Sequence, residues 1–135
     1  MRIVIIDGQG GGVGKLLVEQ LVQACPEAEL IAVGTNAMAT ANMMKGGTAN
    51  GATGENAVVY NCGRADVIVG PIGIVMANAM LGEITPKMAE VVSSCEAALF
   101  LIPMNRYHAT VVGVESKKLA EYVKEAVEQI VELQK

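Results

Sequence analysis

Short apolar runs alternate with amphipathic stretches along the chain. The runs lie at residues 3–6, 30–34, 66–69, 97–102 and 110–114. Continuous apolar runs of this length are typical of strands that are buried on both faces of a sheet. The pattern therefore predicts about five strands, with 110–114 as a short strand at the edge of the sheet.

Helical spacing of apolar residues follows most of these runs. Leu17, Val18 and Leu21 recur at this spacing and Pro26 ends the pattern, which predicts a helix over 12–24. Asn36 can cap a short helix that contains Met38 to Met44. These elements place a strand, a helix and a second strand within about 30 residues, the arrangement of a right-handed βαβ unit with parallel strands.

Two further helices are predicted in the second half of the chain. Thr85 followed by Pro86 predicts a helix start, and Ser116 could cap a last helix with an apolar stripe from Leu119 to Val131. A partly helical run covers 74–81. Residues 55–62 are ambiguous: their valines favour a strand, whereas Gly63 as a C-terminal cap favours a helix, and we predict a helix.

Residues 46–54 form the longest stretch without periodicity, which makes this Gly-rich segment a candidate for a mobile or ligand-ordered loop. The remaining elements alternate between strand and helix. The sequence thus predicts one domain over residues 1–135. Its fold class is a three-layer α/β, Rossmann-like fold, with a mainly parallel sheet of about five strands and helices on both faces.

The composition of the chain argues against several classes of binding partner. The chain is 52% hydrophobic and 18% charged, and its net charge of −4 provides no basic surface for nucleic acid. No apolar run approaches a membrane span, and the first residues lack the pattern of a signal peptide, so a cytoplasmic location is expected. Cys25, Cys62 and Cys95 are too widely spaced for a disulfide framework or a metal site and are predicted to be buried thiols.

The strongest candidate site is the glycine turn that follows the first strand. A strand, a glycine turn and a helix N-terminus together present backbone N–H groups and the positive end of a helix dipole to an anion. Asp7 is expected to bond the N–H groups of its own turn. Lys15 could neutralise a bound phosphate or could simply be solvated. The predicted ligand-binding residues of this turn are Asp7, Gly8, Gln9, Gly10, Gly11, Gly12, Val13, Gly14 and Lys15.

The other strand ends extend the candidate site, because ligands of open parallel sheets bind outside the carboxyl ends of the strands. Glycine and proline also end strands without any ligand, so this assignment competes with a purely structural interpretation. Arg106 could bind a carboxylate or phosphate, or could be a surface charge. The further candidates are Gly34, Thr35, Asn36, Gly70, Pro71, Ile72, Gly73, Asn105 and Arg106.

Known fingerprints fit the turn only in part. Gly8, Gly12 and Gly14 match the G-x-x-x-G-x-G spacing of short-chain dehydrogenase/reductases, but none of the three tyrosines has a lysine four residues later. Gln9 and Leu16 stand where the phosphate loop of NTPases needs a glycine and a hydroxyl residue. The second strand ends in neutral Thr35 and Asn36 rather than in the acid that holds the ribose of NAD. His108, the single histidine, is expected at the surface.

Several motifs together resemble a family of small bacterial proteins known only as a domain of unknown function. The resemblance implies a stand-alone Rossmann-like domain and brings no activity with it. The residues that carry it are Ile-Asp-Gly-Gln-Gly-Gly-Gly at 6–12, Gly-Thr-Asn at 34–36, Ala-Thr-Gly-Glu-Asn at 52–56, Val-Gly-Pro-Ile-Gly-Ile at 69–74 and Leu-Gly-Glu-Ile-Thr-Pro at 81–86.

From the residues we predict a protein that binds a nucleotide or another small phosphorylated metabolite, as a sensing or partner-binding module without turnover. A small NAD(P)- or flavin-dependent oxidoreductase is the alternative. The expected cofactor is NAD or NADP, or otherwise another nucleotide, with no metal. A homodimer interface could be lined by Met38, Met43, Met44, Met76 and Met80, although core packing explains them as well or better.

Overall fold

The protein folds around a five-stranded parallel sheet of strand order β3-β2-β1-β4-β5. The structure, a computed structural model, describes residues 1–104 and 107–135, so the candidate residues Asn105 and Arg106 lie outside it. The strands are β1 (Arg2–Asp7), β2 (Glu29–Gly34), β3 (Gly51–Thr53), β4 (Val67–Pro71) and β5 (Ala98–Ile102). The helices are α1 (Gly12–Ala24), α2 (Ala37–Met44), α3 (Glu55–Cys62), α4 (Pro86–Ser94) and α5 (Leu119–Leu133), with the short 3-10 helix η1 (Ile72–Val75) after β4.

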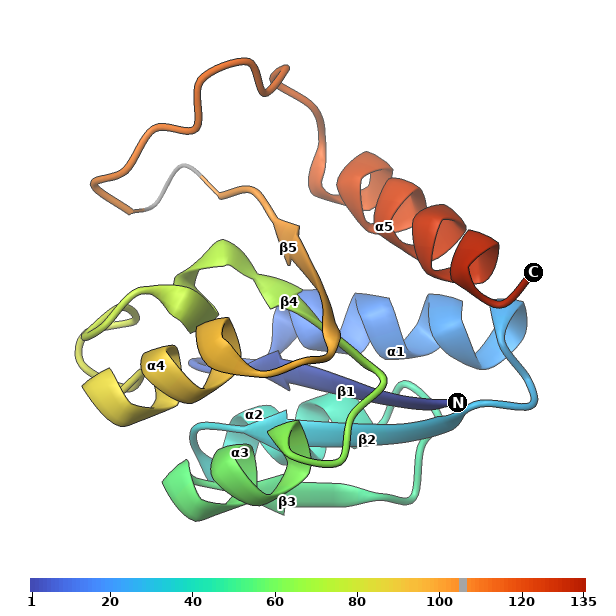
Figure 1. Cartoon of the computed structure of the whole chain (residues 1–135), viewed down its shortest axis with the longest axis horizontal. Coiled ribbons are helices and arrows are strands. Elements are labelled where there is room, and N and C mark those ends of the chain that lie inside the picture. Colours follow the sequence, from blue (N-terminus) through green and yellow to red (C-terminus); the bar gives the residue numbers. More distant parts are fainter. Residues whose placement is uncertain (105–106) are drawn as a thin grey trace.

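Helices cover both faces of the sheet, as the fold class predicts (Figure 1). Ile3 and Ile5 of β1 pack with α1 and α5 on one face, whereas Val4 and Ile6 pack with α3 and α4 on the other. Successive side chains of a strand point to opposite faces, so a strand with helices on both sides must be apolar throughout. This requirement explains the uninterrupted apolar run at the start of the chain.

The strand order reverses direction at β1. From β1 the chain passes through α1 to β2 and on to the edge strand β3, and then returns through α3 to β4 on the other side of β1. The carboxyl ends of β1 and β4 therefore flank the switch point, where open α/β sheets bind their ligands. The glycine turn after β1 lies at this position.

Most element predictions are confirmed. The first helix has the predicted bounds, and residues 55–62 form a helix. Asn36 caps α2 by accepting a hydrogen bond from the Ala39 N–H, and Thr85 caps α4 by accepting one from the Met88 N–H, with Pro86 in the first turn. The starts of α2 and α4 were predictable because a side-chain cap marks each of them.

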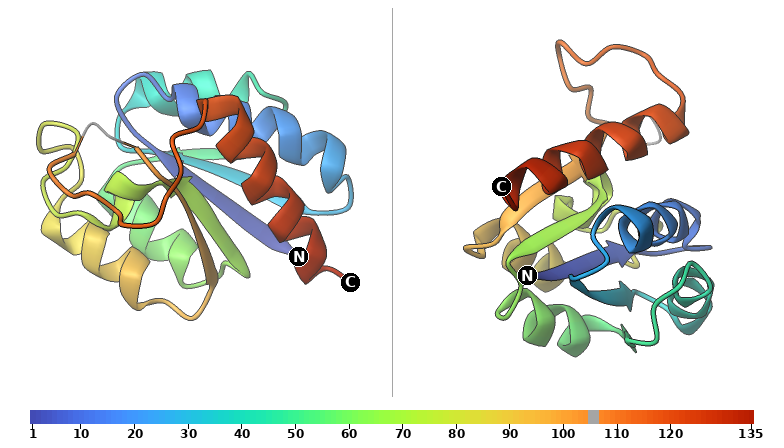
Figure 2. Two further views of the ribbon diagram at one scale, coloured as in Figure 1. Left: turned by 90° about the horizontal axis from the view of Figure 1, so that it is seen from above. Right: turned by 90° about the vertical axis from the view of Figure 1, so that its right-hand side faces the viewer.

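Four predictions are wrong in whole or in part. Residues 110–114 form no strand, and the fifth strand is instead β3, which lies within the segment 46–54 that the sequence predicts as a loop. Ser116 does not cap the last helix, because α5 begins at Leu119 and has no side-chain cap. The helical run expected over 74–81 is limited to η1, which ends at Val75. In Figure 2 the segment after Tyr107 arches away from the sheet before it enters α5.

Several cysteine and methionine side chains pack in the hydrophobic core. Cys25 and Cys62 are buried and Cys95 is half-buried. Burial, together with the nearby Cys95 thiol, raises the pKa of Cys62 to about 12, so this thiol is not a ready nucleophile. Of the five methionines considered for a dimer interface, Met43 and Met80 are buried, Met44 and Met76 are half-buried, and Met38 is 73% exposed.

Candidate functional site

A buried carboxylate organises the β1–α1 turn. Asp7 is 3% exposed, and its Oδ1 accepts a hydrogen bond of 2.8 Å from the Gly8 N–H. Its Oδ2 accepts one of 2.8 Å from the Gly14 N–H, in the first turn of α1. The side chain thus fixes both ends of the turn, as the sequence predicts, and supplies one of the acceptors that a helix N-terminus lacks.

Three glycines of the turn are required by packing inside the chain. A Cβ on Gly8 would lie 2.5 Å from the Thr35 Oγ1, and one on Gly14 would lie 2.3 Å from the Met43 Sδ. Gly11 has a φ of 72°, a left-handed conformation that side chains disfavour, and closely approaches the backbone of Ala39. Neighbouring side chains and backbone strain therefore explain these glycines without a ligand.

Gly10 and Gly12 differ from the other turn glycines. A Cβ on either residue would meet nothing within 4 Å, neither has a left-handed backbone, and both are exposed. Within the described residues, no hydrogen-bond partner is found for the N–H groups of Gly12 and Val13. The half-buried Lys15 follows in the same helical turn. The open side of the turn thus offers free N–H donors at the positive end of α1.

The end of β2 lies against this turn. Asn36 donates from Nδ2 to the Gln9 carbonyl over 2.9 Å, while its Oδ1 accepts from the Ala39 N–H. Asn42 of α2 donates to the Gly10 carbonyl over 2.9 Å. The predicted clustering of the first two strand ends is therefore present, and side-chain amides hold it in place.

Glu83 belongs to this cluster and was not predicted. Its Oε1 accepts hydrogen bonds from the Gln9 N–H (2.8 Å), the Thr35 Oγ1 (2.6 Å) and the Asn36 Nδ2 (2.9 Å). The bond from Thr35, supported by those from Gln9 and Asn36, lowers the pKa of Glu83 against the opposing effect of burial. The carboxylate is therefore ionised at neutral pH. The family motif at 81–86 contains this residue, but its place at the turn depends on contacts far apart in sequence.

The end of β4 fits packing better than ligand binding. A Cβ on Gly70 would lie 2.2 Å from the Ile6 carbonyl oxygen, and one on Gly73 would lie 2.5 Å from the Tyr107 ring. Pro71 is buried and Ile72 half-buried. His108, beyond β5, is exposed as predicted.

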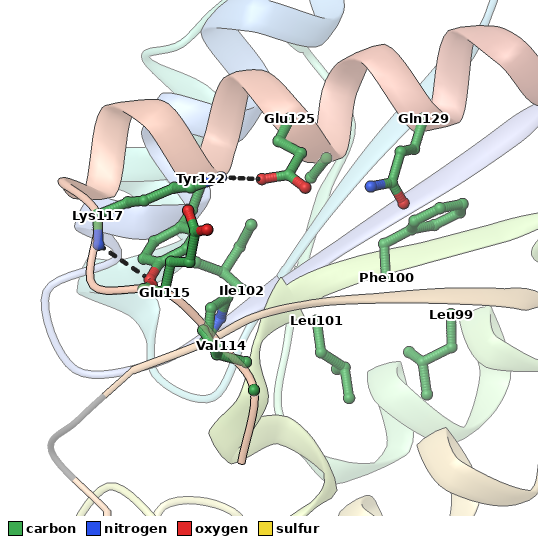
Figure 3. A pocket seen from close by; sticks show the side chains of 13 residues that line it. Leu99, Phe100, Leu101, Ile102, Val114, Glu115, Lys117, Tyr122, Glu125 and Gln129 are labelled. Carbon is green, nitrogen blue, oxygen red and sulfur yellow. Dashed lines mark hydrogen bonds and ion pairs between the residues drawn. The ribbon is translucent and has the colours of Figure 1, made fainter. Parts of the chain in front are cut away.

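Two cavities lie beside β5 rather than at the turn. The larger, of about 530 Å³, runs between β5 and α5 and wraps the exposed edge of the strand (Figure 3). Phe100 points toward α5, whereas Leu99 and Leu101 point to the other face. The second, of about 380 Å³, is lined by the irregular segment that follows β5, including Met104 and Tyr107. Both owe much of their walls to residues 107–117, which carry no regular secondary structure.

The described residues, 1–104 and 107–135, show few signs of another kind of binding site. No group of three potential metal ligands occurs there. Within the same residues, no helix has the length and apolarity needed to cross a bilayer. The candidate site is therefore the turn with its surrounding amides and the Glu83 carboxylate.

The comparisons with known proteins agree with this Rossmann-like arrangement. The family described as domain of unknown function DUF3842 matches residues 2–135, almost the whole chain. The chain belongs to this DUF3842 family. No curated protein matches it.

A solved structure shares the fold. The DUF3842 chain is similar to a dodecameric FMN-dependent UbiX-like decarboxylase from Escherichia coli O157:H7, with a TM-score of 0.54 and 15% sequence identity. The similarity covers 99% of this chain and 94% of the other. At this identity the likeness shows the α/β fold alone.

Proposed function

We propose that the chain binds a nucleotide or a related phosphorylated metabolite at the β1–α1 turn. The observation that carries the proposal is the contrast among the turn glycines: packing explains Gly8, Gly11 and Gly14, but not Gly10 and Gly12. Absence of a side chain at those two positions lets a phosphate approach the free N–H groups at the start of α1. The location at the switch point of the sheet supports the same site.

The ligand is proposed to be held without turnover, so that the chain acts as a sensing or partner-binding module. Asp7 and Asn36 use their side chains to fix the backbone around the turn, and the Thr35 hydroxyl donates to the Glu83 carboxylate. A side chain committed in this way positions a ligand better than it transfers protons.

A small flavin- or NAD(P)-dependent enzyme is the second candidate. The structural neighbour is FMN-dependent, which favours FMN among the cofactors to be tested beside NAD and NADP. That neighbour is also dodecameric, and we propose a homo-oligomer for this chain as well. A cytoplasmic location and the absence of nucleic-acid partners stay predictions.

A thermal-shift panel tests the proposal. The probes are NAD, NADP, FAD, FMN, ATP, GTP and S-adenosylmethionine. A ligand at 100 times its dissociation constant stabilises the fold by about 2.7 kcal/mol, a shift that is readily measured. At least one nucleotide should stabilise the wild-type chain, and a panel without any response would refute nucleotide binding.

The variant Gly12→Val tests whether the ligand that gives the thermal shift binds at the β1–α1 turn. Its side chain enters open space, so the fold should persist while the phosphate approach is filled. Gly63→Val is the matched control, because a Cβ at Gly63 makes only ordinary contacts of 3.7 Å or more at the end of α3. The shift should disappear in Gly12→Val and persist in Gly63→Val.

A further inference from the structure

Rossmann-like sites that bind a ribose place an acidic residue at the end of the second strand, where it accepts from the ribose hydroxyls. Here β2 ends at Gly34 and continues into the neutral Thr35 and Asn36. The Glu83 carboxylate lies in hydrogen-bond contact with both of these residues. An acid is therefore present at the end of β2, although a different part of the chain supplies it.

The segment that carries Glu83 is held in an unusual conformation. Asn78, Met80 and Leu81 all have left-handed φ values, of 67°, 59° and 57°. Such residues cost on the order of 1–3 kcal/mol each and persist where the surroundings impose them. Leu81 is 98% exposed, so burial of its side chain does not offset its strain. Met80, by contrast, is buried beside Gly8 and ties the segment to the turn.

The hydrogen bonds of Glu83 leave one carboxylate oxygen available. The three donors, the Gln9 N–H, the Thr35 hydroxyl and the Asn36 amide, all meet Oε1. Oε2 has no hydrogen-bond partner among the described residues, and Glu83 is partly exposed. An ionised carboxylate accepts hydrogen bonds and repels a second anion. This position thus favours a ligand group that donates, such as a hydroxyl, over a phosphate.

We infer that Glu83 is a ligand-binding residue of the DUF3842 chain and that it selects a hydroxylated ligand. The ligand class is a phosphate ester of ribose or of a sugar alcohol. Its phosphate lies at the Gly12 and Val13 N–H groups, and its hydroxyls donate to Glu83 Oε2. The inference rests on the proposed function, because it assigns the sugar portion of the same ligand.

The test uses isothermal titration of the whole wild-type chain and of Glu83→Gln with AMP, NAD, FMN and inorganic phosphate. Glutamine retains an oxygen that can accept the three donors but lacks the charge, so the turn should stay folded. The hydroxylated probes that the wild type binds should bind Glu83→Gln about tenfold or more weakly, since a hydrogen bond to a charged group contributes this much. Inorganic phosphate should bind the variant as well as the wild type, or better.

Removing hydroxyl groups from the ligand tests the same contact without changing the protein, so the result does not depend on whether a variant folds. If the wild type binds AMP, it should bind 2′,3′-dideoxy-AMP about tenfold more weakly, and it should prefer NAD to NADP because the 2′-phosphate meets the Glu83 charge. Both differences should shrink in Glu83→Gln. The control Glu90→Gln makes the same substitution at an exposed carboxylate of α4, and it should retain both preferences.

Separate outcomes overturn the two proposals. If the wild type binds none of the nucleotides, nucleotide binding itself fails, and the assignment of Glu83 fails with it. If the wild type binds a hydroxylated probe and Glu83→Gln binds it equally well or more tightly, nucleotide binding stands and the role of Glu83 is refuted. An equal weakening of inorganic phosphate and the hydroxylated probes would also refute it, because it would show that Glu83 only supports the turn.

Discussion

The β1–α1 turn and the edge of β5 are built in opposite ways. At the turn, buried or half-buried polar side chains such as Asp7 and Asn36 hold the backbone, and the open space is confined to Gly10 and Gly12. At the β5 edge, cavities of about 530 and 380 Å³ lie beneath an irregular segment, whose Val112 is 94% exposed.

The comparison shows that a large cavity and a well-ordered set of hydrogen-bond donors occur at different places in this protein. The larger cavity beside β5 lies between this strand and α5, where the irregular segment 108–118 arches away from the sheet. At the turn, hydrogen bonds from the surrounding side chains fix the backbone before a ligand arrives. Fixed donors reduce the ordering that binding requires, so the turn is the better candidate despite the cavities beside β5.

The largest effect is expected from removing the carboxylate that holds the turn. Asp7→Ala leaves the Gly8 and Gly14 N–H groups without their acceptor, and each unsatisfied buried donor costs about 1–3 kcal/mol. Urea unfolding should show this loss of stability. Asp66→Ala, at an exposed carboxylate that accepts from the Arg2 N–H, should lose less than about 1 kcal/mol. Equal losses would show that the turn is not specially organised.

A smaller effect is expected at the cation beside the turn. Lys15→Met should weaken binding of the responding nucleotide by about threefold to tenfold, because a charge-assisted contact to phosphate is lost. The exposed Lys45, after α2, provides the control variant Lys45→Met. Titration at low and high salt should show that the difference between wild type and Lys15→Met shrinks as salt rises. No difference at low salt would remove Lys15 from the site.

The pH dependence of stability tests the Glu83 contacts. Hydrogen bonds from Thr35, Gln9 and Asn36 lower the pKa of Glu83 below its ordinary value of 4.5. A depressed pKa stabilises the folded state above about pH 4.5, and this contribution is lost as pH falls through the folded pKa. The stability difference between wild type and Glu83→Gln should therefore diminish between pH 6 and pH 3. A constant difference over this range would contradict the ionised hydrogen-bonded state.

The smallest effect is expected at the β5 edge. Val112→Ser changes a side chain that is 94% exposed, so stability should change by no more than about 0.5 kcal/mol and nucleotide binding should stay the same. Thermal unfolding with and without the responding nucleotide measures both. A loss of nucleotide binding would indicate that the nucleotide binds near the β5 edge rather than at the turn.

Local signals predicted the sheet and the turn well. A βαβ unit, an apolar first strand and side-chain caps such as Asn36 and Thr85 each depend on neighbouring residues. The short strand β3 was missed because Gly51, Ala52 and Thr53 have no apolar pattern and become a strand only by pairing with β2. The valine-rich residues 110–114 suggested a strand, but no pairing partner holds them in one.

The candidate site was only partly predictable, for the same reason. The sequence placed the turn and the end of β2 together, because the topology requires it. It could not place Glu83, which reaches the turn through a left-handed segment, nor distinguish Gly70, which lies against β1, from a ligand-binding glycine.

The most direct measurement compares filling the turn with filling the larger cavity. Gly12→Val adds a side chain at the turn, and Gln129→Trp adds bulk between α5 and β5. Titration of each folded variant with the nucleotide that binds the wild type should show that Gly12→Val loses binding and Gln129→Trp retains it. Retained binding in Gly12→Val together with loss in Gln129→Trp would contradict the account and place the ligand beside β5.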